Sequence, residues 1–575
     1  MNDGSTGLLR VDMTTGEVRV EPLREAWTLL GGRSLSARLL LEDCDPRCDP
    51  LGPENVLIFA GGVLTGTPAP TSGRLSVGAK SPLTGGIKEA NAGGEPAQHL
   101  ARLGIRAVVV TGQPADPEAR FGLEIDEEGA RLVEANDLKG LWTYATCERL
   151  TERYSEKASF ICCGPAGEHR LAGASVACTD QDNRYPARQA SRGGMGAVMG
   201  SKGLKFVAIE PGRSRLRRAA QHTAFVDRAK RIGQAYRQGD QLFAEGTAVG
   251  VLLANSIHSL PYKNRIAGQS PDAETLDGHL IKETFAERGG GMHNCLTGCI
   301  VQCSNVIHNA DGEYKTSALE FETMALLGAN CAVERWEDVA DLDRLCDEVG
   351  LDTIETGAAI AILMEAGRMA WGDVASMKAL FEDIHEGTEL GRAIGSGAVA
   401  TARLTGHTRV PVVKGQAIAA WDPRPLKATG VTYAAGPMGA DHTAGLVVNP
   451  GLGPDEYAQA SQECQIVNMV CDSSGFCQFI SPTLTLMAIY YSLLYGEDVT
   501  PEQLGDQGWE CLEDEWKFNS AAGWKDEDNG LSECLVDEGI GPDNAMKFDV
   551  SLDIINQSKV RFAPRPELYT ARASG

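Results

Sequence analysis

The sequence predicts an α+β protein in which a β-rich first part is followed by two mainly helical parts. Short apolar runs closed by Gly or Pro, which are typical of strands, fill the chain up to about residue 212. After a basic junction, "GRSRLRRAAQHT", apolar residues recur at helical spacing instead. The length of 575 residues also favours three to four domains over one.

The first domain is expected to span residues 1–212. Its strand candidates are "NVLIFAGGVLTG", "IRAVVVTGQ", "SVACTD" and "LKFVAIEPG". The second is expected over 213–415, where "DVADLDRLCDEVG" places Val339, Leu342, Leu345 and Val349 at helical spacing. A break near "GHTRVPVVKGQ" begins the third, 416–575, and no internal repeat is evident.

Charge and composition exclude several classes of function. A net charge of -25 argues against nucleic acid or an anionic membrane surface as partner, because phosphates repel such a field. The start lacks a signal-peptide pattern, and the apolar stretch that begins at Phe479 contains Pro482, so we expect a buried helix and no membrane span. We therefore expect a cytoplasmic protein whose sixteen cysteines are reduced thiols or metal ligands.

Two glycine-rich segments in the first domain are candidate phosphate sites. The first, residues 65–94, contains Arg74 and Asn91. The second, residues 188–205, surrounds Arg192 with glycines: Gly193, Gly194 and Gly196. Glycine lets backbone N–H groups approach an anion closely, and neighbouring arginines supply charge. Ordinary glycine-rich turns of a β domain are the alternative.

Three evenly spaced cysteines, Cys295, Cys299 and Cys303, form the strongest metal-site candidate. Both gaps are i, i+4, so on a regular helix the three thiols would share one face. Three clustered cysteines and a remote fourth are a common way to hold a [4Fe–4S] cluster. Zinc, a disulfide or three buried thiols remain alternatives. Among several candidates for a fourth ligand, Cys477 stands in the turn-like stretch "CDSSGFC".

A further acidic stretch, "GLDTIETG", is typical of a helix start. Asp352 would be the N-cap residue, and Glu355 its reciprocal partner in a capping box.

Together these motifs resemble the aldehyde:ferredoxin oxidoreductase family of tungsten enzymes. The motifs that carry the resemblance occur in family order: "TGTPAPTSGR", "NAGG", "SRGGMGAVMGSK", the cysteine triplet, "LEFETMALLG", "GLDTIETG", "GADH" and "DSSGFC". The resemblance implies a tungsten or molybdenum bis-pyranopterin at the interface of the β-rich domain and the helical domains. It also implies one [4Fe–4S] cluster, and a Mg²⁺ ion that bridges the pterin phosphates.

The resemblance also implies roles for individual residues. Cys295, Cys299, Cys303 and Cys477 would ligate the cluster, and Arg74 would bridge pterin and cluster. Asn91 and the Gly193 backbone would help to hold Mg²⁺, within a cofactor-binding stretch that includes Arg192, Gly194 and Gly196. Asp352 and Asp472 would accept hydrogen bonds from the pterin rings. Glu320 and His442 would be the acid–base groups near the metal.

One spacing departs from the family pattern. The family's usual triplet is C-x2-C-x3-C, whereas this chain has C-x3-C-x3-C. The longer first gap implies a local loop or π-bulge at Cys295, and His293 is the substitute ligand if Cys295 is displaced.

The expected activity is the oxidation of an aldehyde to a carboxylic acid, or the reverse. Electrons would leave through the cluster to a ferredoxin or a small ferredoxin-like subunit, so a homodimer or a hetero-oligomer is compatible with the sequence. Two alternatives stand beside it: a benzoyl-CoA-reductase-type subunit that reduces an aryl-CoA, and a pterin-free iron–sulfur electron-transfer protein.

Overall fold

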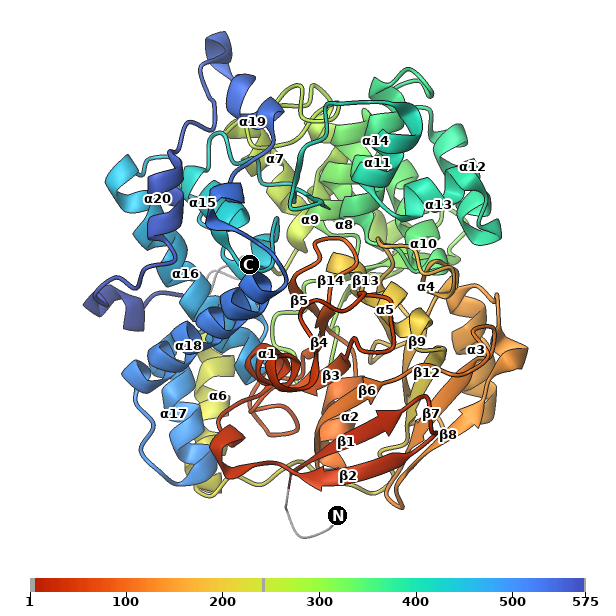
Figure 1. Cartoon of the computed structure of the whole chain (residues 1–575), viewed down its shortest axis with the longest axis vertical. Coiled ribbons are helices and arrows are strands. Elements are labelled where there is room, and N and C mark those ends of the chain that lie inside the picture. Colours follow the sequence, from red (N-terminus) through yellow and green to blue (C-terminus); the bar gives the residue numbers. More distant parts are fainter. Residues whose placement is uncertain (1–5, 240–242, 573–575) are drawn as a thin grey trace.

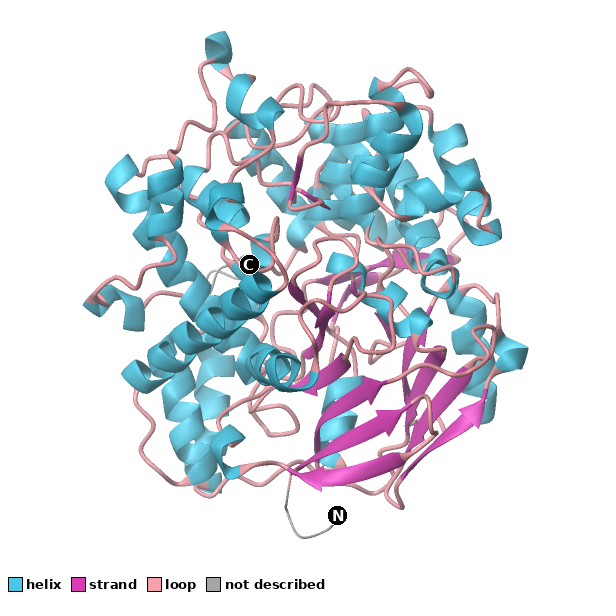
Figure 2. Ribbon diagram, viewed as in Figure 1, coloured by secondary structure: helices cyan, strands magenta, loops and turns pink. Residues whose placement is uncertain are grey.

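Two β-sheets make up the first part of the chain, and helices surround them on two sides (Figures 1 and 2). The computed structural model describes residues 6–239 and 243–572. The predicted fold class is confirmed, because the large mixed sheets end at residue 209 and the chain is mainly helical from there on.

The first sheet has the strand order β2-β1-β6-β3-β4-β5. Its strands are β1 (Gly7–Asp12), β2 (Val18–Pro22), β3 (Leu57–Gly61), β4 (Leu75–Lys80), β5 (Ile87–Ala92) and β6 (Ile105–Thr111). The second sheet has the order β8-β7-β12-β9-β10-β11. Its strands are β7 (Phe121–Ile125), β8 (Ala130–Glu134), β9 (Ser159–Cys163), β10 (Val176–Cys178), β11 (Arg188–Ala190) and β12 (Leu204–Ile209).

The second sheet repeats the topology of the first. In each, the first and last strands along the chain pair in parallel (β1 with β6, β7 with β12), and the other pairs are antiparallel. The expectation of no internal repeat was therefore wrong for the fold. Because a buried strand needs only apolar residues of suitable size, two halves can keep one topology while their sequences diverge.

Five helices accompany the sheets, and the helices of the middle part other than α6 pack into a separate apolar core. The first five are α1 (Gly32–Asp43), α2 (Pro96–Arg102), α3 (Thr143–Arg153), α4 (Pro165–Glu168) and α5 (Met195–Ser201). The middle part contains α6 (His222–Gln238), α7 (Gly250–Ser256), α8 (Gly278–Arg288), a small sheet of β13 (Gly291–His293), β14 (Ser304–His308) and β15 (Tyr314–Ser317), then α9 (Phe321–Thr323), α10 (Trp336–Val349), α11 (Thr353–Glu365), α12 (Val374–Glu386), α13 (Glu389–Gly395) and α14 (Ala398–Thr405).

Long helices of the last part pack on α1 and on the edge of the first sheet. This part contains β16 (Val412–Val413), β17 (Gln416–Ala417), α15 (Lys427–Ala435), α16 (Pro454–Ser474), α17 (Leu484–Tyr495), α18 (Pro501–Ala521), α19 (Glu533–Asp537) and α20 (Leu552–Gln557). In residues 6–239 and 243–572, no helix is both long and apolar enough to span a membrane.

Two helix C-termini reach the two sheets at equivalent places. Gly475 caps the end of helix α16, and its backbone lies so close to Gly62, just after β3, that a Cβ on Gly62 would come within 2.1 Å of the Gly475 nitrogen. Gly350 caps the end of helix α10 and lies beside Gly164, just after β9. Because β3 and β9 are equivalent strands, each half of the β domain receives one helix end, and the space between is the site described next.

Candidate active site

A cavity of about 740 Å³ lies where the two sheets meet the helical parts. The end of β5, β11, the cysteine segment, the ends of α10 and α16 and the segment around His442 all contribute to its wall. Most of the residues singled out in the sequence line it: Arg74, Asn91, Arg192, Cys295, Cys299, Cys303, Glu320, Asp352, His442, Asp472 and Cys477. Residues far apart in the chain therefore converge on one site.

The cysteine triplet lies in a loop between β13 and β14 and not on a helix. The shared helix face considered for these thiols was therefore wrong. Gly298 and Gln302 adopt left-handed backbone conformations, with φ of +83° and +55°, and these turns bring the thiols toward the cavity. Backbone hydrogen bonds fix the loop on the β domain: Gly94 donates to the Cys295 carbonyl and Thr71 to the Gly298 carbonyl.

Arg74 joins the cysteines to the first glycine-rich segment. Its guanidinium donates to the side chain of Asn91 and, at 3.1 Å, to the Asn91 carbonyl. Burial opposes its charge, but the negative charges that Cys477, Cys295, Asp472 and Cys303 carry when ionised raise the pKa of Arg74 overall. A fixed cation beside three of the four cysteines favours a thiolate-ligated, anionic group at this place.

His293 does not face the cavity. Its Nδ1 lies 2.9 Å from a carboxylate oxygen of Asp182, and its side chain is about one-third exposed. Cys295 does line the cavity, and Gly93 approaches it so closely that a Cβ there would lie 3.2 Å from its sulfur. The longer first gap thus lies within the loop, and of the two residues it is Cys295 that lines the cavity.

No three His, Cys, Asp or Glu groups within the described ranges converge tightly enough to hold a single metal ion. Cluster ligands lie further apart than the ligands of one zinc ion, because the iron and sulfide atoms separate them. The disulfide considered for the triplet does not form either, since all the cysteines are free.

Two D-x-x-G sequences place acidic side chains in the cavity wall. "DSSG" contains Asp472 in the last turn of α16, and "DEVG" contains Asp347 in the last turn of α10. The glycine that follows each helix is left-handed, with φ of +75° for Gly350 and +84° for Gly475. Asp347 was missed in the sequence analysis, although the parallel between the two motifs was available there. Burial raises the pKa of both carboxyls well above the usual range.

Asp352 has the predicted N-cap role, because its side chain accepts from the Ile354 N–H at 3.0 Å. The capping-box role of Glu355 was wrong. Its two oxygens accept instead from the backbone N–H groups of Ala398 and Ala417, at 3.0 and 2.9 Å. Burial raises the pKa of Glu355 to about 7.

Arg192 is the member of the second glycine-rich segment that reaches the cavity. It donates to the carbonyls of Ala417 and Ala440, and its Nε lies 3.6 Å from Asp352. The three following glycines do not line the cavity. They allow close packing instead. A Cβ at Gly193 would clash with the Lys88 side chain, one at Gly194 with the Ala172 carbonyl, and one at Gly196 with the Ser175 carbonyl.

Glu320 lies beside the cysteines. Its carboxylate accepts a hydrogen bond from Thr247, and the positive charges of Arg188 and Arg74 lie near it. Burial nevertheless raises its pKa above the usual range.

Whereas the sequence pointed to Glu320, the carboxylate nearest to His442 among the described residues is Glu322. Its Oε1 lies 3.6 Å from His442 Nε2, and its Oε2 accepts from the Ala420 N–H at 2.6 Å. The two acids of "LEFETM" thus face different partners. A short helix over residues 321–323 and a π-helical turn over 324–328 follow Glu320, so the spacing of the motif alone does not reveal which acid meets the histidine.

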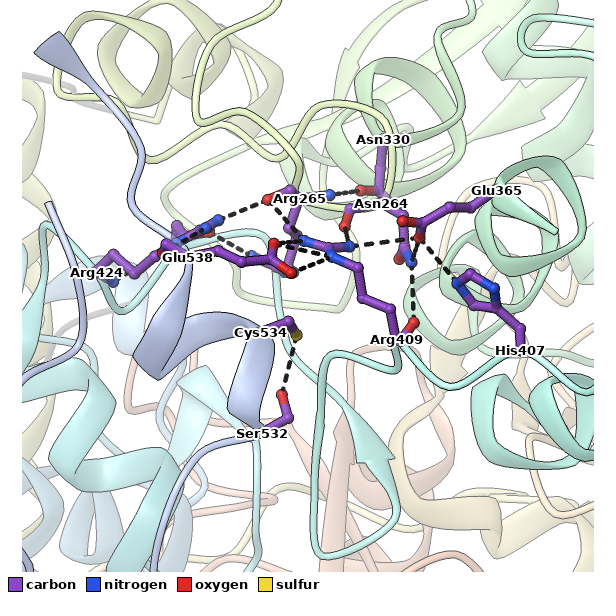
Figure 3. A network of polar contacts seen from close by, with 11 residues as sticks. Asn264, Arg265, Asn330, Glu365, His407, Arg409, Arg424, Ser532, Cys534 and Glu538 are labelled. Atoms are coloured by element: carbon purple, nitrogen blue, oxygen red, sulfur yellow. Dashed lines mark hydrogen bonds and ion pairs between the residues drawn. The ribbon is translucent and has the colours of Figure 1, made fainter. Parts of the chain in front are cut away.

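Two buried arginines, Arg265 and Arg424, hold the loop that carries the Ala420 N–H from behind, and both belong to the polar network in Figure 3. Arg265 donates to the carbonyls of Ile418 and Ala419 and pairs with Asp422 at 3.3 Å. Arg424 holds the same carboxylate at 2.8 and 2.9 Å. This network fixes the loop, and so fixes the N–H that orients Glu322.

Several polar atoms in the cavity wall are buried and lack a hydrogen-bond partner. They are Arg188 Nε, Arg192 Nε and Nη1, Glu322 Oε1, Asp352 Oδ2, His442 Nδ1 and Asp472 Oδ2. Each unsatisfied buried group costs about 1–3 kcal/mol. Donors and acceptors that point into one cavity are suited to a polar ligand that carries both N–H donors and anionic oxygens.

The chain matches two family models. Residues 8–211 match the N-terminal domain of aldehyde ferredoxin oxidoreductase, and residues 225–557 match domains 2 and 3 of the same family. The chain belongs to the aldehyde ferredoxin oxidoreductase family. It is therefore an oxidoreductase, as the sequence predicted.

Among its family relatives are two tungsten-containing aldehyde ferredoxin oxidoreductases. That of Pyrococcus furiosus is 32% identical over 558 residues, which cover 90% of this chain and 88% of the relative. That of Thermococcus kodakarensis is 32% identical over 503 residues, covering 82% and 81%. The fold is also similar to the active-site complex BamBC of benzoyl coenzyme A reductase, with a TM-score of 0.77, 19% identity and coverage of 92% and 90%.

Proposed function

We propose that this member of the aldehyde ferredoxin oxidoreductase family oxidises an aldehyde to a carboxylic acid, or runs the reverse reaction, with a tungsten or molybdenum bis-pyranopterin and one [4Fe–4S] cluster. The observation that carries the proposal is the convergence on one cavity of four cysteines, two D-x-x-G carboxylates and the Glu322–His442 pair. The relatives named as tungsten-containing support the choice of metal.

The residues present fit these groups. Cys295, Cys299, Cys303 and Cys477 supply thiolates of the kind that binds iron–sulfur clusters. Arg192 and Arg188 supply unpaired donors for anionic oxygens. The carboxyls of Asp347, Asp352 and Asp472 supply acceptors for ring N–H groups.

The repeated β domain also suits a pair of similar ligands. Each half brings one glycine-rich segment and one helix end with its aspartate to the cavity: Asp472 at the first sheet and Asp347 at the second. We assign the bridging Mg²⁺ that the family resemblance implies to the region of Asn91, which lines the cavity, whereas Gly193 packs against Lys88 outside the cavity wall.

Oxidation of an aldehyde with water as oxygen source yields the acid, two electrons and two protons. The chemistry that the bound metal–pterin group and cluster supply is the uptake of the electron pair and its release as single electrons. A carboxylate in this cavity accepts a proton, and His442 donates a hydrogen bond to the carbonyl oxygen as its negative charge grows. Glu320, the acid named from the sequence, and Glu322, the acid paired with His442, are the two candidates for the proton acceptor.

The expected electron acceptor is a ferredoxin or a ferredoxin-like subunit, in a homodimer or hetero-oligomer located in the cytoplasm.

The test is anaerobic activity with aldehydes and an artificial one-electron dye. Activity on aldehydes and none on aryl-CoA thioesters supports the proposal. Activity on an aryl-CoA alone favours a benzoyl-CoA-reductase-type reaction. Iron without tungsten, molybdenum or pterin identifies a simple electron-transfer protein.

A further inference from the structure

One segment of this acidic chain is strongly basic. Residues 213–237 contain a single acid, Asp227, whereas the whole chain has 78 acids and 53 lysines and arginines. The basic residues of the segment are Arg213, Arg215, Arg217, Arg218, Arg228, Lys230, Arg231 and Arg237. The second half of this segment is helix α6.

Most of these side chains face solvent without a carboxylate partner. Arg213, Arg215, Arg218, Lys230 and Arg231 are exposed. Among the described residues none of these five has an acid within ion-pair distance, although basic side chains elsewhere in the chain are commonly paired. A stretch of unpaired cations on a protein of net charge -25 is the place to which an acidic partner is attracted.

The C-terminal end of α6 contacts the cysteine loop. Helix α6 packs on α17, where Phe225 and Tyr490 lie edge to face with ring centroids 5.0 Å apart, and Figure 1 shows the two helices together. Two residues before the end of α6, Tyr236 packs against the apolar cluster that contains Cys295 and Cys299. Burial and the neighbouring thiols raise the pKa of Tyr236 to about 12. Arg231 precedes Tyr236 by about 7.5 Å along the helix, at 1.5 Å per residue.

The cysteine loop itself reaches the surface at this place. Thr297, Gly298 and Gln302 are exposed between the cysteines, and Cys303 is half-buried. Phe243 and Phe479 stack at 4.2 Å beside the loop, and both are half-buried. A small apolar centre next to a charged helix resembles the interfaces of transient electron-transfer complexes.

We propose that the exposed face of α6, with Lys230 and Arg231 at its centre, and the adjoining cysteine loop form the docking surface for a small acidic iron–sulfur electron carrier. The proposal rests on the proposed function, in which electrons leave through these cysteines. Because the rest of the molecule is acidic, such a carrier is repelled elsewhere and attracted here. Charge thus selects the orientation that brings the carrier close to the cysteine loop.

The test uses the holoenzyme and a purified acidic two-cluster ferredoxin as probe. The variant is K230E/R231E, and the matched control is R403E/K547E, which reverses two exposed basic residues that have no ion pair among the described residues and lie outside this surface. We expect K230E/R231E to raise the Kd for ferredoxin at least about tenfold at low ionic strength, with iron content and dye-linked activity unchanged. The control variant keeps the wild-type Kd.

Salt provides a second criterion. Raising NaCl from about 20 to 300 mM weakens ferredoxin binding to the wild type, since screening shortens the range of charge attraction, and the dependence is flatter for K230E/R231E. An unchanged Kd in K230E/R231E overturns the docking surface, as does binding of DNA or of a second copy of the chain in preference to ferredoxin. A wild-type enzyme that oxidises no aldehyde in the dye-linked assay would instead refute the proposed function. The two outcomes are distinguishable because the docking surface is judged only on the Kd for ferredoxin.

Discussion

At the scale of single residues, the geometry of the two acids in "LEFETM" separates their roles. Glu322 faces His442, whereas Glu320 lies among Thr247, Arg188 and the cysteines. If Glu322 accepts the proton, Glu322→Gln lowers kcat by about 10²-fold or more while the metal and iron contents stay at the wild-type level. Steady-state kinetics with metal analysis checks this. Full turnover in Glu322→Gln would exclude it, and full turnover in Glu320→Gln would exclude the assignment made from the sequence.

The raised pKa of Glu320 gives a prediction for pH. A base works only as the carboxylate, so activity that depends on Glu320 falls as pH decreases through this raised pKa. The acid limb of kcat/KM against pH would then lie above the usual Glu value of about 4.3 and disappear in Glu320→Gln. An acid limb that persists unchanged in this variant would assign the limb to another group.

Cys295 and His293 can be distinguished by iron content. Cys295 lines the cavity, whereas His293 pairs with Asp182 outside it. We expect Cys295→Ser to lose most of the iron and the cluster's electron paramagnetic resonance signal, and His293→Ala to keep both. The reverse pattern would show that the histidine is the ligand.

At the scale of elements, the loop that includes Ala417 and Ala420 depends on two buried groups behind it. Glu355 accepts the Ala417 N–H, and its folded-state pKa of about 7 exceeds that of an exposed Glu. Between about pH 4.5 and 7 the folded protein therefore keeps a proton that the unfolded chain has released. Stability should fall by roughly 3 kcal/mol as pH rises through this window. Thermal melting at several pH values should show this slope, and the slope should be smaller in Glu355→Gln.

Arg265 supports the same loop through the Ile418 and Ala419 carbonyls. We expect Arg265→Met to lower kcat about tenfold with little change in iron content, because the N–H that orients Glu322 loses its fixed position. Arg409→Met is the control, since Arg409 belongs to the network in Figure 3 but bonds Glu538 and the backbone of Asn264 and Arg265 instead of this loop. Equal activity of the two variants would contradict the positioning role.

The sequence predicted the elements better than their local geometry. Val339, Leu342 and Val349 are buried on one face of α10, and Asp352 caps α11, as their spacing indicated. The i, i+4 spacing of the cysteines suggested a helix, yet left-handed turns at Gly298 and Gln302 make this segment a loop. Tertiary contacts outweigh a periodicity that rests on only three residues. The pairing of His442 with Glu322 depends on the π-helical turn and on Ala420, which no local pattern reveals.

At the scale of the whole molecule, a buried ion pair joins the first and last parts. Arg33 of α1 donates to both oxygens of Glu515 on α18, at 2.9 and 2.8 Å, and both side chains are almost fully buried. Glu515→Ala leaves the guanidinium without its main partner, and such a loss costs about 3–5 kcal/mol. We expect a clearly lower melting temperature for Glu515→Ala than for the exposed substitution Glu513→Ala. Equal melting temperatures would show that this contact does not hold the parts together.

The repeated β domain was not predictable from residue identity, because the repeat lies in strand order and in the placing of Gly62 and Gly164. The presence of the site was predictable, since eleven of the residues singled out line one cavity. The sequence could not reveal which polar atoms in the cavity wall lack a hydrogen-bond partner. These atoms are the donors and acceptors that a bound polar ligand would satisfy.

We propose that this cavity holds a metal–pterin group next to an iron–sulfur cluster. Elemental analysis of anaerobically purified, active protein, combined with fluorescence of the released pterin, tests it most directly. We expect about one tungsten or molybdenum and about four iron atoms per chain, with pterin released on denaturation. Active protein that contains neither tungsten nor molybdenum would contradict it.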